Sequence, residues 1–156
     1  MTMLKNTILI VIFFFTASCG YEAVHSEKNS KKYNFSITSI NFEGDRDVNL
    51  KIKQKFNNYV QNKKDKQFQL SIKSTSTREI LAKDDAGNST SFKNTIIVYV
   101  EIFLEDNLKN NLQIKKSFKY NNITNKFDLK NYERELKMNL AETISDELIF
   151  KLSKIQ

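Results

Sequence analysis

The sequence predicts an α+β fold, a two-layer sandwich in which two helices cover a mostly antiparallel four-stranded sheet in the order β-α-β-β-β-α. Two kinds of apolar spacing carry this prediction. Some runs alternate every second residue, as in strands, and others step by three and four residues, as in helices. The composition agrees, because 40% of the residues are hydrophobic and 12% are aromatic, which is typical of a globular chain.

The first strand is expected from Tyr33 to Phe42, with a turn after it at Glu43-Gly44-Asp45. Apolar residues alternate up to Ile37 and resume at Ile40 in the opposite phase. A change of phase by one residue moves the side chains to the other face of a sheet unless a bulge corrects it. We therefore expect an irregularity near Ser39.

A helix should follow, capped at its start by Asp45 or Asp47 and ending near Asn62. Its apolar residues recur at helical spacing and share one face, which is the face expected to meet the sheet. These residues are Val48, Ile52, Phe56, Tyr59 and Val60.

The centre of the chain reads as strands. Phe68–Ile72 alternates, Ser74–Thr77 continues it with residues that tolerate extended structure, and Ala82–Ser91 is expected to form a turn or loop. Thr95–Leu104 is the most apolar stretch after the first 18 residues and suits a central strand with one face on the core. That face consists of Ile96, Val98, Val100, Ile102 and Leu104.

Glu105–Asn111 is expected to form a turn, and Leu112–Tyr120 the neighbouring hairpin strand. A long helix from about Asp128 to Lys154 should close the domain and span ~40 Å, enough to cross the sheet. Its apolar stripe is expected to pack on the sheet rather than form a coiled coil. The stripe consists of Leu129, Tyr132, Leu136, Leu140, Ile144, Leu148 and Leu152.

The start of the chain has the parts of a secretory signal peptide: basic Lys5, the apolar run Thr7–Phe15 and small residues at Ala17-Ser18. Cys19, the only cysteine, follows at once. This arrangement resembles the lipobox of bacterial lipoproteins, in which that cysteine is lipidated and becomes the first residue of the mature chain. In such lipoproteins Asp at the next position often means retention in the inner membrane, so Gly20 favours the outer membrane.

The other interpretations of this segment are a membrane-spanning anchor, a buried core cysteine and an ordinary cleaved signal peptide. A membrane-spanning anchor is disfavoured because a spanning helix needs ~20 apolar residues. Cleavage by an ordinary signal peptidase, with Cys19 incidental, stays open. The preferred organisation is a signal peptide over residues 1–18, a lipidated tether over 19–32 and a single α+β domain over 33–156.

The composition disfavours an enzyme. The folded region carries no histidine to activate a nucleophile, because the single histidine, His25, lies in the tether. Nor does the sequence contain a metal-binding or phosphate-binding motif. We therefore expect no catalytic residues, no metal and no cofactor apart from the covalent lipid on Cys19.

The formal net charge is +7, or +6 without Lys5, which suits an anionic partner such as an acidic glycolipid. The signal peptide argues against nucleic acid. A general bias of residue usage toward Lys explains the charge equally well, because only Arg46, Arg78 and Arg134 are arginines.

Three local features resemble the LPS-assembly lipoprotein family, LptE, in its short form. They are Cys19-Gly20-Tyr21 at the mature start, Gly44-Asp45-Arg46 in the turn from strand to helix, and the C-terminal block Phe92–Leu152. In that block a strand ends in Lys119-Tyr120-Asn121, and the helix contains Glu133-Arg134 and Leu140-Ala141-Glu142. The resemblance covers nearly the whole mature chain.

The resemblance implies an outer-membrane lipoprotein, anchored on the periplasmic face, that sits in the lumen of an LptD-like LPS-assembly β-barrel, helps that barrel assemble and binds lipopolysaccharide. The alternative is an accessory lipoprotein of a periplasmic lipid-transport system without a barrel partner. Lys115, Lys116 and Lys119 are the candidate glycolipid contacts. A solvated face in a Lys-rich protein is the competing interpretation of these lysines.

We expect that Cys19→Ala abolishes lipid attachment, because the thiol is the acceptor of the acyl groups. Metabolic labelling with a radioactive fatty acid measures this, with the wild-type chain labelled in parallel. Fatty-acid label retained on the alanine variant would refute the lipobox interpretation.

Overall fold

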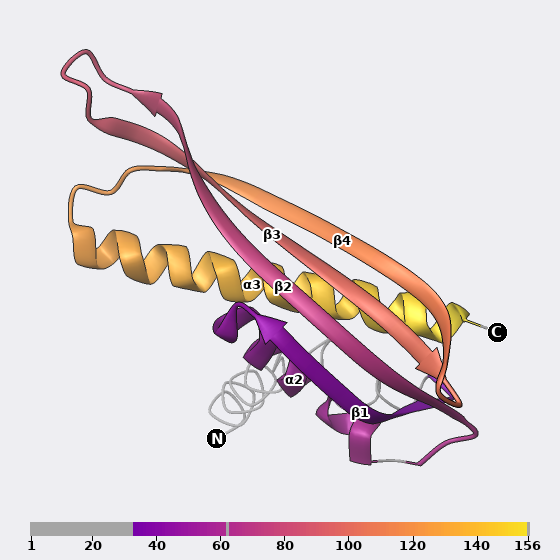
Figure 1. Cartoon of the computed structure of the whole chain (residues 1–156). Coiled ribbons are helices and arrows are strands. Elements are labelled where there is room, and N and C mark those ends of the chain that lie inside the picture. The colour runs from indigo at the N-terminus through magenta and orange to yellow at the C-terminus, as the bar shows by residue number, and fades with distance from the viewer. Residues whose placement is uncertain (1–32, 62, 156) are drawn as a thin grey trace, which may run out of the picture. The chain divides into compact units, whose positions relative to one another are not determined.

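A computed structural model describes residues 33–61 and 63–155. The expected signal peptide, the tether, Cys19 and His25 therefore lie outside the described residues. The elements in chain order are β1 (Phe35–Gly44), α2 (Arg46–Gln61), β2 (Lys66–Lys83), β3 (Ser89–Leu104), β4 (Asn107–Asn121) and α3 (Lys126–Lys154) (Figure 1).

The four strands form one sheet in the order β1-β2-β3-β4. The β1–β2 pair is parallel, because α2 carries the chain back between them, and the other two pairs are antiparallel. Both helices pack on the same face of the sheet (Figure 1). The predicted two-layer α+β sandwich and its element order are confirmed.

The core lies between the helices and the sheet. Ile96, Val98, Val100 and Ile102 of β3 are buried there, as predicted, whereas Leu104 is half-buried. The predicted irregularity near Ser39 is confirmed by a shift in the β1–β2 register between Ile37 and Ser39. The bulge lets β1 follow β2 although its apolar pattern changes phase.

The helices follow the predicted stripes with two corrections. Val60 of α2 is 47% exposed and does not belong to the buried face, while Val48, Ile52, Phe56 and Tyr59 do. In α3 only the C-terminal part of the stripe is deeply buried, and Tyr132 is 41% exposed because the first turns of α3 extend past the core. No helix in the described part of the chain is both long and apolar enough to cross a membrane.

Two expected loops are mostly strand. The segment Ala82–Ser91 forms the end of a long β2–β3 hairpin, and its turn covers only 84–88. The expected turn Glu105–Asn111 shrinks to Glu105 and Asp106, whose φ angles of 51° and 62° are those of a tight hairpin turn. The predicted turn begins at the right residue but is too long, because Glu105 and Asp106 are not the glycine or asparagine that usually mark the two positive-φ positions of such a turn.

The junction between β1 and α2 depends on a close backbone approach. Gly44 has a φ of 99°, and a Cβ there would lie 1.9 Å from the carbonyl oxygen of Ser74. The next residue, Asp45, donates its N–H to that same oxygen at 3.1 Å. Its carboxylate accepts hydrogen bonds from the N–H groups of Asp47 and Val48, so Asp45 is the N-cap of α2.

An ion-pair cluster joins the exposed sides of the two helices. Lys51 and Lys55 of α2 lie 2.9 Å and 2.6 Å from the carboxylate of Glu142 in α3. Hydrogen bonds from Lys55 and then Lys51 lower the pKa of Glu142 from 4.5 to about 2. The carboxylate therefore stays charged under all but strongly acidic conditions.

We expect this cluster to make stability depend on pH. The pKa of Glu142 is lower in the folded than in the unfolded chain, so its contribution is complete above about pH 4.5 and is lost as the pH falls toward 2. Because the side chains are partly exposed, Glu142→Gln should remove only about 1 kcal/mol of unfolding free energy near neutral pH. Thermal unfolding across this pH range measures the difference.

Glu135→Gln is the matched control, because Glu135 is an exposed carboxylate of the same helix outside every ion pair of the described residues. The control should keep the wild-type dependence on pH. Identical dependence in wild type and Glu142→Gln would contradict this role for the cluster.

Candidate functional site

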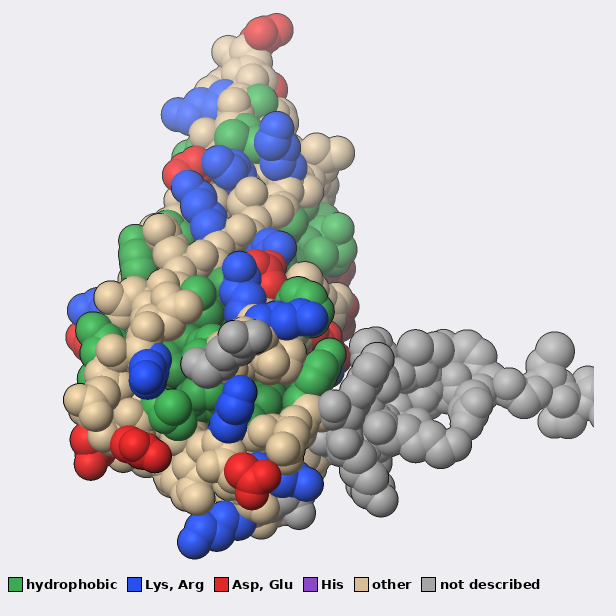
Figure 2. Space-filling model, turned by 90° about the vertical axis from the view of Figure 1, so that its right-hand side faces the viewer, with side chains coloured by type: hydrophobic (Ala, Val, Ile, Leu, Met, Phe, Trp, Pro, Cys, Tyr) green, Lys and Arg blue, Asp and Glu red, His purple; other side chains and the backbone are tan. Residues whose placement is uncertain are grey.

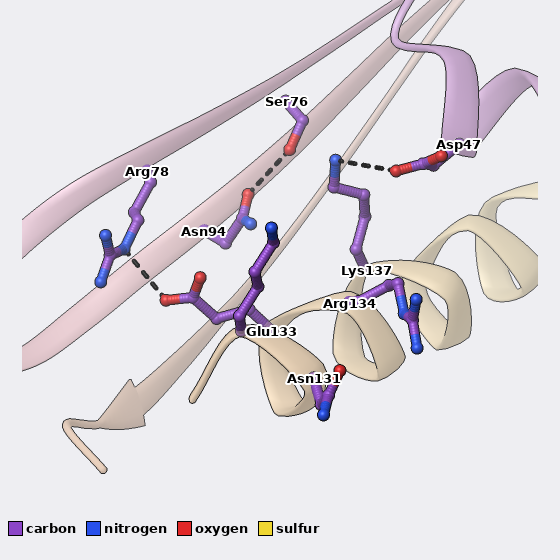
Figure 3. Close-up of a pocket in the computed structure, with 9 residues that line it drawn as sticks. Asp47, Ser76, Arg78, Asn94, Asn131, Glu133, Arg134 and Lys137 are labelled. Carbon is purple, nitrogen blue, oxygen red and sulfur yellow. Dashed lines mark hydrogen bonds and ion pairs between the residues drawn. The ribbon is translucent and has the colours of Figure 1, made fainter. Parts of the chain in front are cut away.

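A cleft of about 340 Å³ lies between the β2–β3 hairpin and the first turns of α3. Ser76, Arg78 and Asn94 form its wall on the sheet side, and α3 forms the opposite wall (Figure 3). Asp47, near the start of α2, closes one end. We call this the Arg78 cleft. The residues of α3 that line it are Lys130, Asn131, Glu133, Arg134 and Lys137.

One polar node joins the two walls. Arg78 Nε donates a hydrogen bond to the hydroxyl oxygen of Tyr120 and forms an ion pair with Glu133 Oε1, both at 3.1 Å. The Tyr120 hydroxyl in turn donates to Glu133 Oε1 at 2.6 Å. The Arg78 guanidinium also lies 3.9 Å from the ring centroid of Phe92, where a cation–π contact adds to its attraction.

Tyr120 keeps its proton in this node. Burial and then the hydrogen bond to Glu133 raise the pKa of Tyr120 to about 12, against a lowering effect of Arg78. The phenol is therefore a hydrogen-bond donor at physiological pH. The node therefore joins β2, β4 and α3 through two hydrogen bonds and an ion pair.

The remaining cations of the cleft differ in their partners. Lys137 reaches Asp45 at 2.9 Å and Asp47 at 3.8 Å, and Figure 3 shows it extending from α3 toward Asp47. Lys130 and Arg134 have no ion-pair partner among residues 33–61 and 63–155. Two positive charges of the Arg78 cleft therefore remain available to an anion.

A second cleft of about 380 Å³ lies on the other side of the Arg78–Glu133 pair. It is bounded by the connection from β4 to α3, including Thr124, and it adds Lys126 to the local positive charge. Arg78, Lys130 and Glu133 line both clefts. Positive charge is thus concentrated where the hairpin meets the start of α3.

The three lysines predicted from the sequence lie on β4, and the structure does not bring them together. Lys116 shares the helix-covered face with Ile114 and pairs with Glu147 of α3 at 2.7 Å. Lys115 and Lys119 are exposed on the opposite face of the strand. Positive side chains are also dispersed elsewhere, since Figure 2 shows Lys and Arg over the whole height of one face.

Sequence inspection missed the Arg78 cleft. The available signal was that two of the three arginines, Arg78 and Arg134, lie in it, but they come from segments far apart in the sequence. The described residues contain no group of His, Cys, Asp and Glu side chains suited to hold a metal ion. Chemically, the cleft can bind an anionic group by charge and hydrogen bonds.

No protein-family model matches this sequence. The search of curated proteins also found no match. Among solved structures the domain is similar to rare lipoprotein B from Shewanella oneidensis, with a TM-score of 0.56 and 11% identity over 73% of this chain and 92% of that one. It is equally similar to lipoprotein B from Nitrosomonas europaea, with a TM-score of 0.56 and 11% identity over 76% and 83% of the two chains. The chain therefore has the fold of these lipoproteins.

Proposed function

We propose that this chain is an outer-membrane lipoprotein that plugs the LPS-export β-barrel, helps it assemble and assists delivery of lipopolysaccharide to the cell surface. Its partners in this proposal are an LptD-like barrel and the glycolipid itself. The proposal assigns no catalytic step, and the lipid on Cys19 is the only attached group. It anchors the chain to the periplasmic face of the outer membrane.

The observation that carries the proposal is the combination of fold and lipidation signal. Solved lipoproteins share the fold at 11% identity, and the lipobox at Cys19 is a sequence feature independent of that likeness. Two or more acyl chains on one cysteine give stable membrane anchoring. A compact domain with a polar, basic exterior is compatible with the polar lumen of a large barrel.

The Arg78 cleft supports the glycolipid part of the proposal. A lipid phosphate is a compact dianion whose oxygens accept charge-assisted hydrogen bonds from Lys and Arg. Lys130 and Arg134 offer such donors without first breaking an ion pair of the described residues. We therefore propose the Arg78 cleft as a glycolipid contact, in addition to the candidate lysines of β4.

Co-purification tests the barrel partner. The chain, extracted in detergent with a C-terminal affinity tag, should bring down an outer-membrane β-barrel in stoichiometric amount, and the barrel should be depleted in cells that lack the chain. Recovery of inner-membrane transport proteins without a barrel would instead support the accessory-subunit alternative.

Glycolipid binding distinguishes the two candidate sites. We expect Lys130→Gln/Arg134→Gln to weaken lipopolysaccharide binding about tenfold or more, because two charge-assisted hydrogen bonds are lost. Binding of labelled lipopolysaccharide to the detergent-solubilised protein measures the affinity. The wild-type affinity should also fall as salt rises, since exposed charges are screened.

Lys115→Gln/Lys119→Gln is the matched control, because it removes the same formal charge from exposed positions of β4. It should weaken binding much less. If both double variants lose the same affinity for lipopolysaccharide, only the overall charge matters. If only the β4 variant loses affinity, the glycolipid site lies on β4 instead.

A further inference from the structure

Part of β2 has an unpaired edge. β1 pairs with β2 only as far as Ser74, although β2 continues to Lys83. On the other side, β3 stays paired with β2 along the whole hairpin. Among residues 33–61 and 63–155, no strand therefore lies beside the outer edge of Thr75–Lys83, and Thr75, Thr77 and Arg78 are exposed.

The backbone groups on this edge can be identified. The carbonyl of Ser74 points toward β1, because it accepts the hydrogen bond from Asp45. Alternate residues of a strand direct their backbone N–H and C=O groups to the same side. The backbone groups of Ser76, Arg78 and Ile80 therefore face the open edge, whereas those of Thr75 and Thr77 face β3. The register stays regular up to Ile80, where a bulge follows.

The Arg78 cleft lies directly beneath this edge. Ser76 and Arg78 form its wall on the sheet side, and Asp47 at the start of α2 marks where β1 has already left the sheet. The cleft lies beyond Ser74, where β1 no longer pairs with β2, and residues of α3 line its opposite side. A strand added beside Ser76–Ile80 would cover the cleft and direct alternate side chains into it.

We propose that this edge binds an extended segment of another protein by β-strand addition, with an Asp or Glu side chain of that segment placed in the Arg78 cleft. Main-chain hydrogen bonds to Ser76, Arg78 and Ile80 supply affinity. The unpaired charges of Lys130 and Arg134 select the acidic side chain. The inference goes beyond the proposed function, because it requires no glycolipid.

A second copy of this chain fits the edge poorly. Pairing of two such edges would keep the helix-side residues on one face, so Arg78 of each copy would meet the cationic cleft of the other. The outer edge of β4 is also unpaired among the described residues. It carries the exposed Lys115 and Lys119, and charged lysines disfavour strand pairing at the edges of native sheets. In the β2 edge the two charged residues between Ser74 and Ile80 are already engaged, since Arg78 lines the cleft and Glu79 pairs with Lys93 at 3.8 Å.

The test uses the mature protein in detergent and a capped peptide of alternating Thr and Val with Glu at its centre. Backbone hydrogen exchange, followed by NMR, should slow about tenfold or more at Ser76, Arg78 and Ile80 when the peptide is added, because their N–H groups gain partners. The amides of Thr75 and Thr77, which already face β3, should not change. The peptide with a central Gln should bind more weakly than the Glu peptide, and the peptide with a central Lys should bind most weakly of the three.

Ser76→Pro should abolish peptide binding, because it removes one outward N–H and leaves the β3 ladder intact. Thr77→Ala is the control, because Thr77 is exposed on the opposite face of the same strand, does not line the cleft and directs its N–H to β3, so peptide binding should be unchanged. If Ser76→Pro fails to fold, the same main-chain hydrogen bonds can be removed from the peptide side. A Glu peptide whose amides on the pairing edge are N-methylated should not bind. Lys130→Gln/Arg134→Gln should retain edge protection but lose the preference for Glu over Gln.

Three results would overturn the proposal. The first is peptide binding without protection at Ser76 and Arg78, and the second is equal binding of the Glu and Lys peptides. The third is protection of the same amides without peptide that rises with protein concentration, which would mean pairing between copies. Lipopolysaccharide binding is measured separately, so loss of glycolipid binding with intact peptide binding counts only against the proposed function.

Discussion

The contact of Gly44 with the Ser74 carbonyl determines where the sheet changes width. Only a residue without a Cβ fits there, and its positive φ turns the chain out of β1. Asp45 then caps α2 and also holds Lys137 of α3 at 2.9 Å, so one junction sets the start of one helix and its attachment to the other. Beyond Ser74 the edge of β2 that faces away from β3 has no paired strand among the described residues, and the Arg78 cleft lies beside that open edge.

The node of Arg78, Tyr120 and Glu133 attaches the base of the β2–β3 hairpin to β4 and α3. The hairpin extends past the core, where few apolar contacts hold it, and the node connects its base to β4 and α3 through hydrogen bonds within one aromatic cluster. Because these groups satisfy one another, the cleft keeps its shape without a ligand, and a bound anion would interact chiefly with Lys130 and Arg134.

Much of the positive charge has a structural use. Lys51 and Lys55 pair with Glu142, Lys116 pairs with Glu147, and Lys137 pairs with Asp45. The net charge of the sequence therefore overstates the charge that is available to a partner. Position decides the difference, since a lysine beside a helix carboxylate is neutralised and one in an uncovered cleft is not.

The sequence by itself determined the fold class, the element order, the core face of β3 and the bulge near Ser39, because each depends on local spacing. It left the cap of α2 open between Asp45 and Asp47, and the structure decided for Asp45. The sequence also predicts a lipidation site at Cys19, from a segment that resembles a lipobox. Only the tertiary structure decided that Lys116 pairs with Glu147 and that the β2–β3 hairpin extends beyond the end of β1. It also decided that one cleft is lined by Arg78, Lys130 and Arg134. These depend on where strands stop relative to one another and on contacts between distant segments, neither of which periodicity along a single chain records.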